Sequence, residues 1–394
     1  GVDLRVARIA VHSTTKDRGV DVSPDTFTTD AAAVVADPEI DVVVETIGGI
    51  EPARELVLAA LAGGKPVVTA NKELLANHGA ELYDAAAAAG VDLLFEAAVA
   101  GAIPLMRPLR ESLAGDPIGR VMGIVNGTTN YILSQMSDHG VSYQAALADA
   151  QSLGYAERDP TADVEGYDAG AKAAIIATIA FGARVVAGDV YHEGIGSITS
   201  SDVDHARHLG FVIKPVAIAE SVAGPDGPEV AVRVHPAMIA EDHPLASVNG
   251  SFNAVFIEGG AVGDLMLYGR GAGGMPTASA VLGDVIDAAA NLQRRAAAPL
   301  GSFGRARIRP IDQVRSAYYL NIDVADEPGV LAQVAEVFGR HRVSIRSMEQ
   351  EGLDAEQGPG AEARIVFITH AAVEADVQAT LHDLRLLDAV DRIG

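Results

Sequence analysis

The first third of the chain alternates short apolar runs with longer alanine-rich stretches. The short runs are rich in Val and Ile, as buried strands are, and the stretches between them have the length and spacing of helices. Strands are therefore expected at residues 6–11, 41–46, 66–70 and 92–96, and helices at 51–61 and 73–89. Apolar strands separated by helices indicate a parallel sheet covered on both faces, so residues 1–119 are expected to form a doubly wound α/β domain.

The pattern changes after this domain. A helix at residues 167–181 is rich in Ala and Ile and is expected to be buried, and a helix at 277–292 is expected to return and pack on the first domain. Residues 120–276 therefore predict an α+β domain inserted into, or appended to, the first. Its strand candidates are residues 120–125, 230–234, 253–258 and 263–268.

The last part of the chain follows a segment without apolar periodicity. Residues 293–315 contain Pro299, Gly301 and Pro310 and are expected to form a linker. Beyond them, residues 316–394 read as strand, helix, two strands and helix, ending in a short strand near Asp391. That order predicts a ferredoxin-like unit.

Charge and composition narrow the class of protein. The chain has 53 acidic and 29 basic side chains and a formal net charge of −24. A surface this negative repels nucleic acid and anionic lipid, so we expect neither as a partner and expect a cytoplasmic protein. The absence of cysteine excludes a disulfide, a thiolate metal site and a cysteine nucleophile.

The carboxyl ends of the expected parallel strands carry candidate ligand-binding residues. Ligands of such sheets bind at this edge, where Thr46 is followed by Gly48 and Gly49 and where Lys72 follows a later strand. The alternative is that the glycines form an ordinary turn and Lys72 is a solvated residue. The first domain lacks a GxGxxG loop, and because the chain enters an apolar strand almost at once, an earlier segment is expected to be missing.

The candidate site with the most charged residues lies directly before the expected buried helix and in its first turns. Residues 154–172 contain several carboxylates and end at Lys172, four positions after Asp168, so these two side chains share one helix face. A lysine beside carboxylates at the start of a buried helix can act as a general acid. The alternative is an ordinary salt bridge between residues one turn apart.

Two further loops have an open interpretation. Residues 95–104 leave a strand as a run of small residues, which could turn several backbone carbonyls toward one monovalent cation or could simply be a tight connection. Residues 126–130 form a polar turn before a helix, for which the N-cap role is expected.

Five segments of the sequence together resemble the homoserine dehydrogenase family, in that family's order and spacing. They are residues 68–72, 96–104, 123–130, 154–172 and 268–278. The resemblance implies a Rossmann-like nucleotide-binding domain, then a substrate-binding, catalytic and dimerisation domain, and reduction of L-aspartate 4-semialdehyde to L-homoserine with a nicotinamide cofactor. It also implies a homodimer or homotetramer.

The resemblance assigns roles to individual residues. Lys172 would donate the proton to the aldehyde oxygen, with Asp168 orienting it and Lys72 adding positive charge nearby. Glu157, Asp163 and Asp168 would bind the substrate, and Thr46, Lys72 and Gly273 would contact the cofactor. A structural sodium ion would be held by Glu96, Val99, Gly101 and Ile103.

The cofactor preference stays open because the sequence departs from the family pattern. His12 and Ser13 follow the first strand where members that prefer NADP often have arginine, and the nearest basic residues are Lys16 and Arg18. We favour NADP over NAD.

The C-terminal unit resembles an ACT domain. Its strand-to-helix turn is residues 326–332, where Gly329 would allow backbone contact with a small amino acid. For this family the implied effector is L-threonine, with feedback inhibition. The alternative is a dimerisation module that no longer binds a ligand.

Other classes of protein remain as competitors. The absence of a glycine loop favours a catalytically silent amino-acid sensor on a dehydrogenase scaffold, whereas the joint presence of Lys72, Glu157, Asp168 and Lys172 argues against it. A semialdehyde dehydrogenase that forms an acyl enzyme needs a cysteine, which is lacking. An aldolase that uses Lys172 fits poorly with a nucleotide-type domain.

Overall fold

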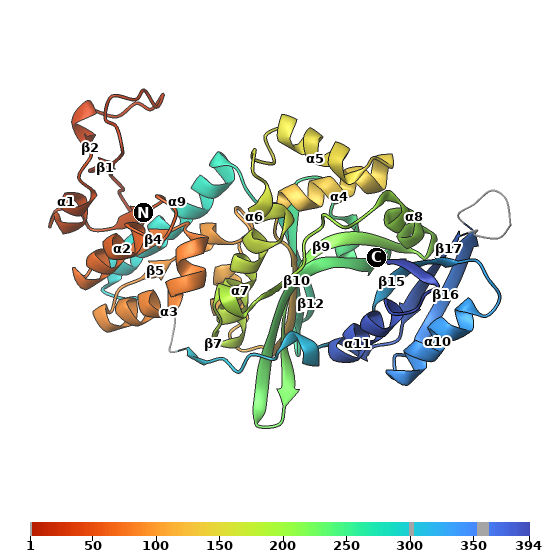
Figure 1. Ribbon diagram of the computed structural model, residues 1–394. Helices are drawn as coiled ribbons and strands as arrows, with labels where there is room; N and C mark the ends of the chain where they lie inside the picture. Colours follow the sequence, from red (N-terminus) through yellow and green to blue (C-terminus); the bar gives the residue numbers. More distant parts are fainter. Residues whose placement is uncertain (1, 299–302, 353–361) are drawn as a thin grey trace. The chain divides into compact units, whose positions relative to one another are not determined.

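A computed structural model describes residues 2–298, 303–352 and 362–394 (Figure 1). The chain forms two compact units, one of residues 1–196 with 211–308 and the other of residues 197–210 with 309–394. None of the described helices is long and apolar enough to cross a membrane.

A three-stranded parallel sheet forms the core of the first domain, in the order β3-β4-β5. Alternate residues of a strand face opposite sides: Val67 packs in the cluster that holds α2 and α3, and Val68 packs with Ala288 of α9. Helices thus cover both faces, and α9 returns to this sheet as the sequence predicts (Figure 1). The bounds are β3 Val43–Glu45, α2 Ala53–Ala62, β4 Val67–Thr69, α3 Lys72–Ala89, β5 Leu93–Leu94 and α9 Gly274–Arg294.

The expected buried strand at residues 6–11 is wrong in length and burial. Only β1 (Ile9–Ala10) is extended and paired, in parallel with β2 (Phe27–Thr28), and α1 (Ala31–Ala36) follows. The side chain of Val6 is 63% exposed. The pair forms its own two-stranded sheet and is not hydrogen-bonded to β3, so no neighbouring strand buries this segment.

The second domain is built on a six-stranded sheet in the order β12-β11-β6-β9-β10-β8, antiparallel except for β10 and β8. The strands are β6 Ile118–Ile124, β8 Tyr191–His192, β9 Phe211–Gly224, β10 Gly227–Ala240, β11 Phe252–Gly259 and β12 Gly263–Arg270. The sequence analysis did not include β9 among its strand candidates, although it begins with the apolar run Phe211-Val212-Ile213. In the structure, Pro215 lies opposite Pro236 of β10.

The helices of this domain follow the sequence closely. The expected buried helix is α7, and Ala173, Ala174 and Ile176 are among its buried residues. It packs on β9 and β10 and carries the candidate proton donor in its second turn. The helices are α4 Gly127–His139, α5 Tyr143–Ser152, α6 Thr161–Val164 and α7 Tyr167–Phe181.

The expected linker is only partly irregular. Residues 299–302, which include Pro299 and Gly301, lie outside the described residues. Helix α9 extends to Arg294, and β13 (Gly304–Arg305) pairs with β7 (Ala183–Arg184). Residues 304–305, in the middle of the expected linker, therefore attach to the first unit through hydrogen bonds, whereas residues from 309 on belong to the second unit.

The second unit has the expected ferredoxin-like order, with an antiparallel sheet β16-β17-β15-β19. Its core contains Ile322, Val334, Phe338 and Phe367. The short final strand near Asp391 is present as β19. The bounds are β15 Tyr319–Ala325, α10 Val330–Arg340, β16 Ile345–Gly352, β17 Glu362–Thr369, α11 Glu374–Leu384 and β19 Val390–Ile393, with the small pair β14 (Arg315–Ser316) and β18 (Ala372–Val373).

Helix α8 (Ser200–His208) belongs to this second unit, whereas the sequence placed residues 197–210 inside the central domain. The Asp202 carboxylate accepts hydrogen bonds from the Tyr319 hydroxyl (3.0 Å) and the Asn321 amide of β15. Arg364 of β17 donates to Ser201 Oγ (2.8 Å). These bonds hold α8 on the sheet although more than a hundred residues separate the segments.

Candidate active site

Two lysines from different helices meet at the carboxylate of Asp168. Gly166, with φ of 83°, lets the chain turn into α7, so that Asp168 lies in the first turn. Lys172 Nζ is 2.7 Å from Asp168 Oδ2, and Lys72 Nζ, from the start of α3, donates to Oδ1. The structure thus brings together the three residues that the sequence analysis named as catalytic.

The electrostatics of this cluster are unusual for a surface pair. Asp168 is only 8% exposed, and burial by itself would raise the pKa of its carboxyl. The charges and hydrogen bonds of Lys172 and Lys72 outweigh that effect and hold the pKa of Asp168 well below its ordinary value. Asp168 is therefore a carboxylate at neutral pH.

An ordinary salt bridge within one helix does not describe this arrangement. Besides Asp168, Lys172 Nζ donates to the carbonyl of Val125 (2.8 Å), at the end of β6. An ammonium has three N–H groups, so these two partners leave one for a further acceptor. A lysine held in this way can present a proton to a carbonyl oxygen.

Hydrogen bonds join the carboxyl ends of β3 and β4, where Lys72 begins its helix. Asn71 caps α3 by accepting from Leu74 N (3.0 Å), and its amide donates to the Gly49 carbonyl (2.7 Å). Thr69 Oγ1 donates to Glu45 (2.5 Å). The backbone that carries Lys72 is thereby fixed, while its side chain is 43% exposed.

The expected cofactor contacts lie in exposed turns. Thr46 is exposed directly after β3, and Gly48 and Gly49 have φ of 79° and 70°, a region that favours glycine. Gly273 is exposed and precedes α9 with φ of 122°. A turn without side chains at the start of a helix allows a phosphate to approach the backbone.

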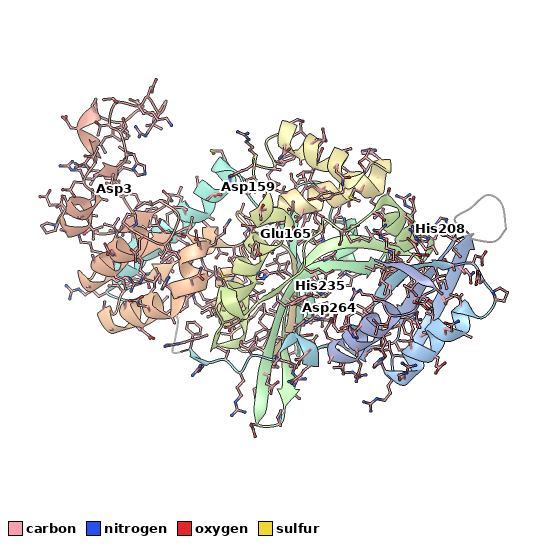
Figure 2. All side chains as sticks on the ribbon, in the orientation of Figure 1. Asp3, Asp159, Glu165, His208, His235 and Asp264 are labelled. Atoms are coloured by element: carbon pink, nitrogen blue, oxygen red, sulfur yellow. The ribbon has the colours of Figure 1, made fainter. Side chains whose placement is uncertain are left out.

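The expected substrate-binding carboxylates lie before α6 (Glu157), within it (Asp163) and after it (Asp168). Asp163 Oδ1 accepts a hydrogen bond from the Asn126 amide (2.7 Å), which links it to the Asp168 cluster. Glu157 is exposed, and among the described residues its carboxylate makes no hydrogen bond or ion pair, whereas its backbone carbonyl accepts from the Gln151 amide (3.1 Å). Asp159 and Glu165, labelled in Figure 2, mark this segment on either side of α6.

Asn126 is a site residue that the sequence analysis did not name. It was expected only as a helix cap, and it does cap α4 by accepting from Thr129 N (2.9 Å). Its amide nitrogen also donates to Asp168 Oδ2 (2.9 Å). Asn126 lies in one of the family-like segments, residues 123–130, but this contact joins different elements, and local spacing does not reveal it.

The loop expected to hold a cation follows β5. The carboxylate of Glu96 is occupied, since it accepts from the backbone N–H groups of Met106 (2.7 Å) and Arg107 (3.0 Å). In the described part of the chain, no backbone N–H donates to the carbonyls of Val99, Gly101 or Ile103. Nor do the described residues contain a group of three or more His, Asp or Glu side chains able to hold a metal.

The turn before α10 has the geometry that its sequence predicts. Gly329 adopts φ of 98° at the N-terminus of that helix. Asp326, three residues earlier, accepts a hydrogen bond from the Gln350 amide (3.3 Å). A Cβ at Gly329 would have no neighbour within 4 Å.

A parallel-sheet domain with a lysine and carboxylate cluster beside its strand ends is the arrangement of many nucleotide-dependent enzymes, among them nicotinamide-dependent oxidoreductases. Family models match in three parts: "Homoserine dehydrogenase, NAD binding domain" at residues 2–96, "Homoserine dehydrogenase" at 104–286 and "ACT domain" at 318–385. The chain belongs to the homoserine dehydrogenase family and carries a C-terminal ACT domain.

Individual relatives agree with this assignment. The chain is 51% identical to a homoserine dehydrogenase of Mycobacterium tuberculosis, with 100% of this chain and 89% of the relative covered. The crystal structure of a homoserine dehydrogenase from Thiobacillus denitrificans is similar with a TM-score of 0.92 at 42% identity, over 100% of this chain and 89% of that one. A hyperthermophilic archaeal homoserine dehydrogenase in complex with NADPH is similar with a TM-score of 0.59 at 30% identity, over 68% and 76%.

Proposed function

We propose that this chain catalyses the reversible reduction of L-aspartate 4-semialdehyde to L-homoserine. The observation that carries the proposal is the Lys172 ammonium, which is held by Asp168 and the Val125 carbonyl with one N–H left for substrate. A bound nicotinamide supplies or accepts the hydride. Lys172 donates its proton to the aldehyde oxygen in reduction and accepts the hydroxyl proton in oxidation.

The other charged residues divide the remaining tasks. Lys72, which donates to Asp168 Oδ1, adds a second positive charge to the cluster. This charge stabilises the negative charge that develops on the substrate oxygen. Asp163 and Asp168 bind polar groups of the substrate. The exposed carboxylate of Glu157 binds the substrate ammonium.

We assign NADP as the preferred cofactor, with NAD as the alternative. Arg18 lies in the loop after β1, where its guanidinium is 5.4 Å from the centre of the Phe27 ring and donates to the carbonyls of Ser13 and Lys16, both at 2.8 Å. An ordered cation in this loop suits a 2′-phosphate. The archaeal relative bound to NADPH is consistent with this choice.

A structural sodium ion would be held by backbone at the loop after β5. The carbonyls of Val99, Gly101 and Ile103 are its ligands in this proposal, and Glu96 orders the loop through its backbone contacts. Ala100 and Gly101 both have φ of 58°, so the backbone turns sharply there. Neutral oxygen donors of this kind suit a hard monovalent cation better than a transition metal.

The ACT domain supports a proposal for regulation and assembly. L-Threonine is the proposed effector at the turn of Asp326 and Gly329, with feedback inhibition of the dehydrogenase, and the assembly is a homodimer or homotetramer. The net charge of −24 fits a cytoplasmic enzyme.

The test is homoserine-dependent reduction of NADP and NAD by the wild-type chain, Lys172→Ala and Lys172→Arg. Loss of a general acid and base lowers kcat by about a hundredfold or more, so both variants should be severely impaired. Arginine keeps the charge and the ion pair but does not release its proton. Full activity of Lys172→Arg would make Lys172 a salt-bridge residue, and an inactive wild type would favour the silent amino-acid sensor.

A further inference from the structure

The side chain of Asn126 contacts two carboxylates of the active site at once. It lies between β6 and α4 and is 5% exposed. Its amide nitrogen donates to Asp163 Oδ1 (2.7 Å) and to Asp168 Oδ2 (2.9 Å). Its amide oxygen accepts from the backbone N–H of Thr129 (2.9 Å). Both donors and the acceptor of the amide are thus used.

The charges around this amide explain why a neutral donor is needed. Asp163 from α6 and Asp168 from α7 repel each other, and Lys72 from α3 and Lys172 from α7 balance them. These two carboxylates and two ammonium groups are the charged side chains that the hydrogen bonds join around Asn126. An N–H group directed at each carboxylate satisfies both without adding charge.

Val125, the residue before Asn126, binds Lys172, the partner of Asp168 in the catalytic pair. The Val125 carbonyl accepts from Lys172 Nζ (2.8 Å), while Asn126 donates to the same Asp168 oxygen that accepts from Lys172. Two consecutive residues therefore fix the position of the Lys172 ammonium and the plane of the Asp168 carboxylate. The direction of the remaining Lys172 N–H follows from these two contacts.

We propose that Asn126 is a positioning residue that aims the Lys172 proton donor by fixing Asp168, beyond its role as the cap of α4. This inference rests on the proposed homoserine dehydrogenase reaction. It predicts that the amide donor of Asn126, separately from its cap acceptor, controls the rate and pH dependence of turnover.

Asn126→Asp separates the two roles, because aspartate and asparagine cap helices about equally well. The variant keeps an acceptor for Thr129 N but replaces the donor by a third carboxylate. The matched control is Ser142→Asp, which adds a carboxylate at the N-cap of α5, where Ser142 accepts from Ala145 N and is exposed. Both are measured in the full chain by homoserine oxidation across pH.

We expect kcat of Asn126→Asp to fall by about tenfold or more, because a hydrogen bond to a charged group is lost. The rising limb of its pH profile should move up by about one pH unit, because the added carboxylate stabilises the ammonium forms nearby. The KM for the cofactor should stay within about twofold, and Ser142→Asp should match the wild type. An unchanged kcat would indicate a cap role alone and overturn the proposal, because aspartate keeps the cap. A drop in kcat with an unshifted pH profile would also overturn it.

Asn126→Ser covers the case in which Asn126→Asp does not fold, since serine caps the helix without adding charge. Its kcat should fall by about tenfold with no shift of the pH profile, and an unchanged kcat would overturn the proposal. Stability gives a second readout that does not depend on turnover. Asn126→Ser should lower the urea midpoint of the wild-type chain, but it should change the midpoint little when it is introduced into the Asp168→Asn variant. Wild-type chain without homoserine turnover would overturn both the reaction and this inference, whereas an active wild type with unaffected variants overturns only the inference.

Discussion

Lys72 and Asp168 form an ion pair between the first turns of α3 and α7, although 96 positions separate them in the chain. The contact ties the parallel-sheet domain to the helix that carries the proton donor. It also gives Asp168 a second cation, so its ionisation depends on two helices at once.

Replacing Asp168 should reveal this dependence as a change of stability with pH. In the unfolded chain the carboxyl titrates near 3.8, and in the folded chain its pKa is lower because two lysines outweigh the effect of burial. The charged form therefore stabilises the fold above about pH 4, and this contribution is lost as pH falls through the folded pKa. Asp168→Asn should be less stable than the wild type by about 2 kcal/mol at pH 7, and the difference should shrink below pH 4. Urea unfolding from pH 7 to pH 3 measures this, and a difference independent of pH would contradict it.

Lys214 should also make stability rise with pH, but in the alkaline range. It is 1% exposed and donates to the Val248 carbonyl (2.7 Å) and to Asn249 Oδ1 (2.8 Å), and burial lowers the pKa of Lys214 to about 8. Between that value and the ordinary 10.5 the unfolded chain holds a proton that the folded chain has released, so stability rises with pH, by at most about 1.4 kcal/mol per unit. Lys214→Met should lose this rise, measured as the wild-type minus variant difference from pH 7.5 to 10. Parallel curves would show that Lys214 stays charged.

The loop after β5 and the loop before α9 should tolerate no side chain where they cross. A Cβ on Gly101 would lie 2.3 Å from the Gly271 carbonyl oxygen, and φ of Gly101 is 58°. Gly101→Ala should therefore cost about 3 kcal/mol, from overpacking together with backbone strain. Gly140→Ala is the matched control, because φ there is 64° with nothing within 4 Å, and it should cost about 1 kcal/mol. Equal losses in thermal or urea unfolding would show that the two loops move apart easily.

The attachment of α8 to the second unit should depend on Asp202. This residue is 6% exposed, caps its own helix with Thr199, and accepts from the Tyr319 hydroxyl. Asp202→Ala should destabilise the second unit by about 3 kcal/mol, because several hydrogen bonds to a buried carboxylate are lost. Hydrogen exchange should show faster exchange in both α8 and β15. Faster exchange in α8 alone would mean that the helix does not stabilise the sheet.

Much of the fold was predictable because it depends on local patterns. The strands at β3, β4 and β5, the buried helix α7 and the ferredoxin-like order of the second unit follow from apolar periodicity. The prediction of a buried strand at residues 6–11 was wrong because a strand is buried only when neighbouring strands or helices cover it. Only two of these residues have a partner strand. Strand β9 was not among the predicted strands, and its central place in the second sheet depends on its pairing with β6 and β10.

The sequence by itself determined which residues lie one helical turn apart and which turns need glycine. It therefore paired Asp168 with Lys172 and marked Gly329 as a turn residue, since such relations need only the geometry of a helix or turn. Tertiary structure alone decided that Lys72 joins Asp168, that Asn126 bridges two carboxylates, and that α8 packs with the C-terminal sheet. These contacts link elements far apart in the chain, and their partners are set by how whole helices and sheets pack, which no local spacing encodes.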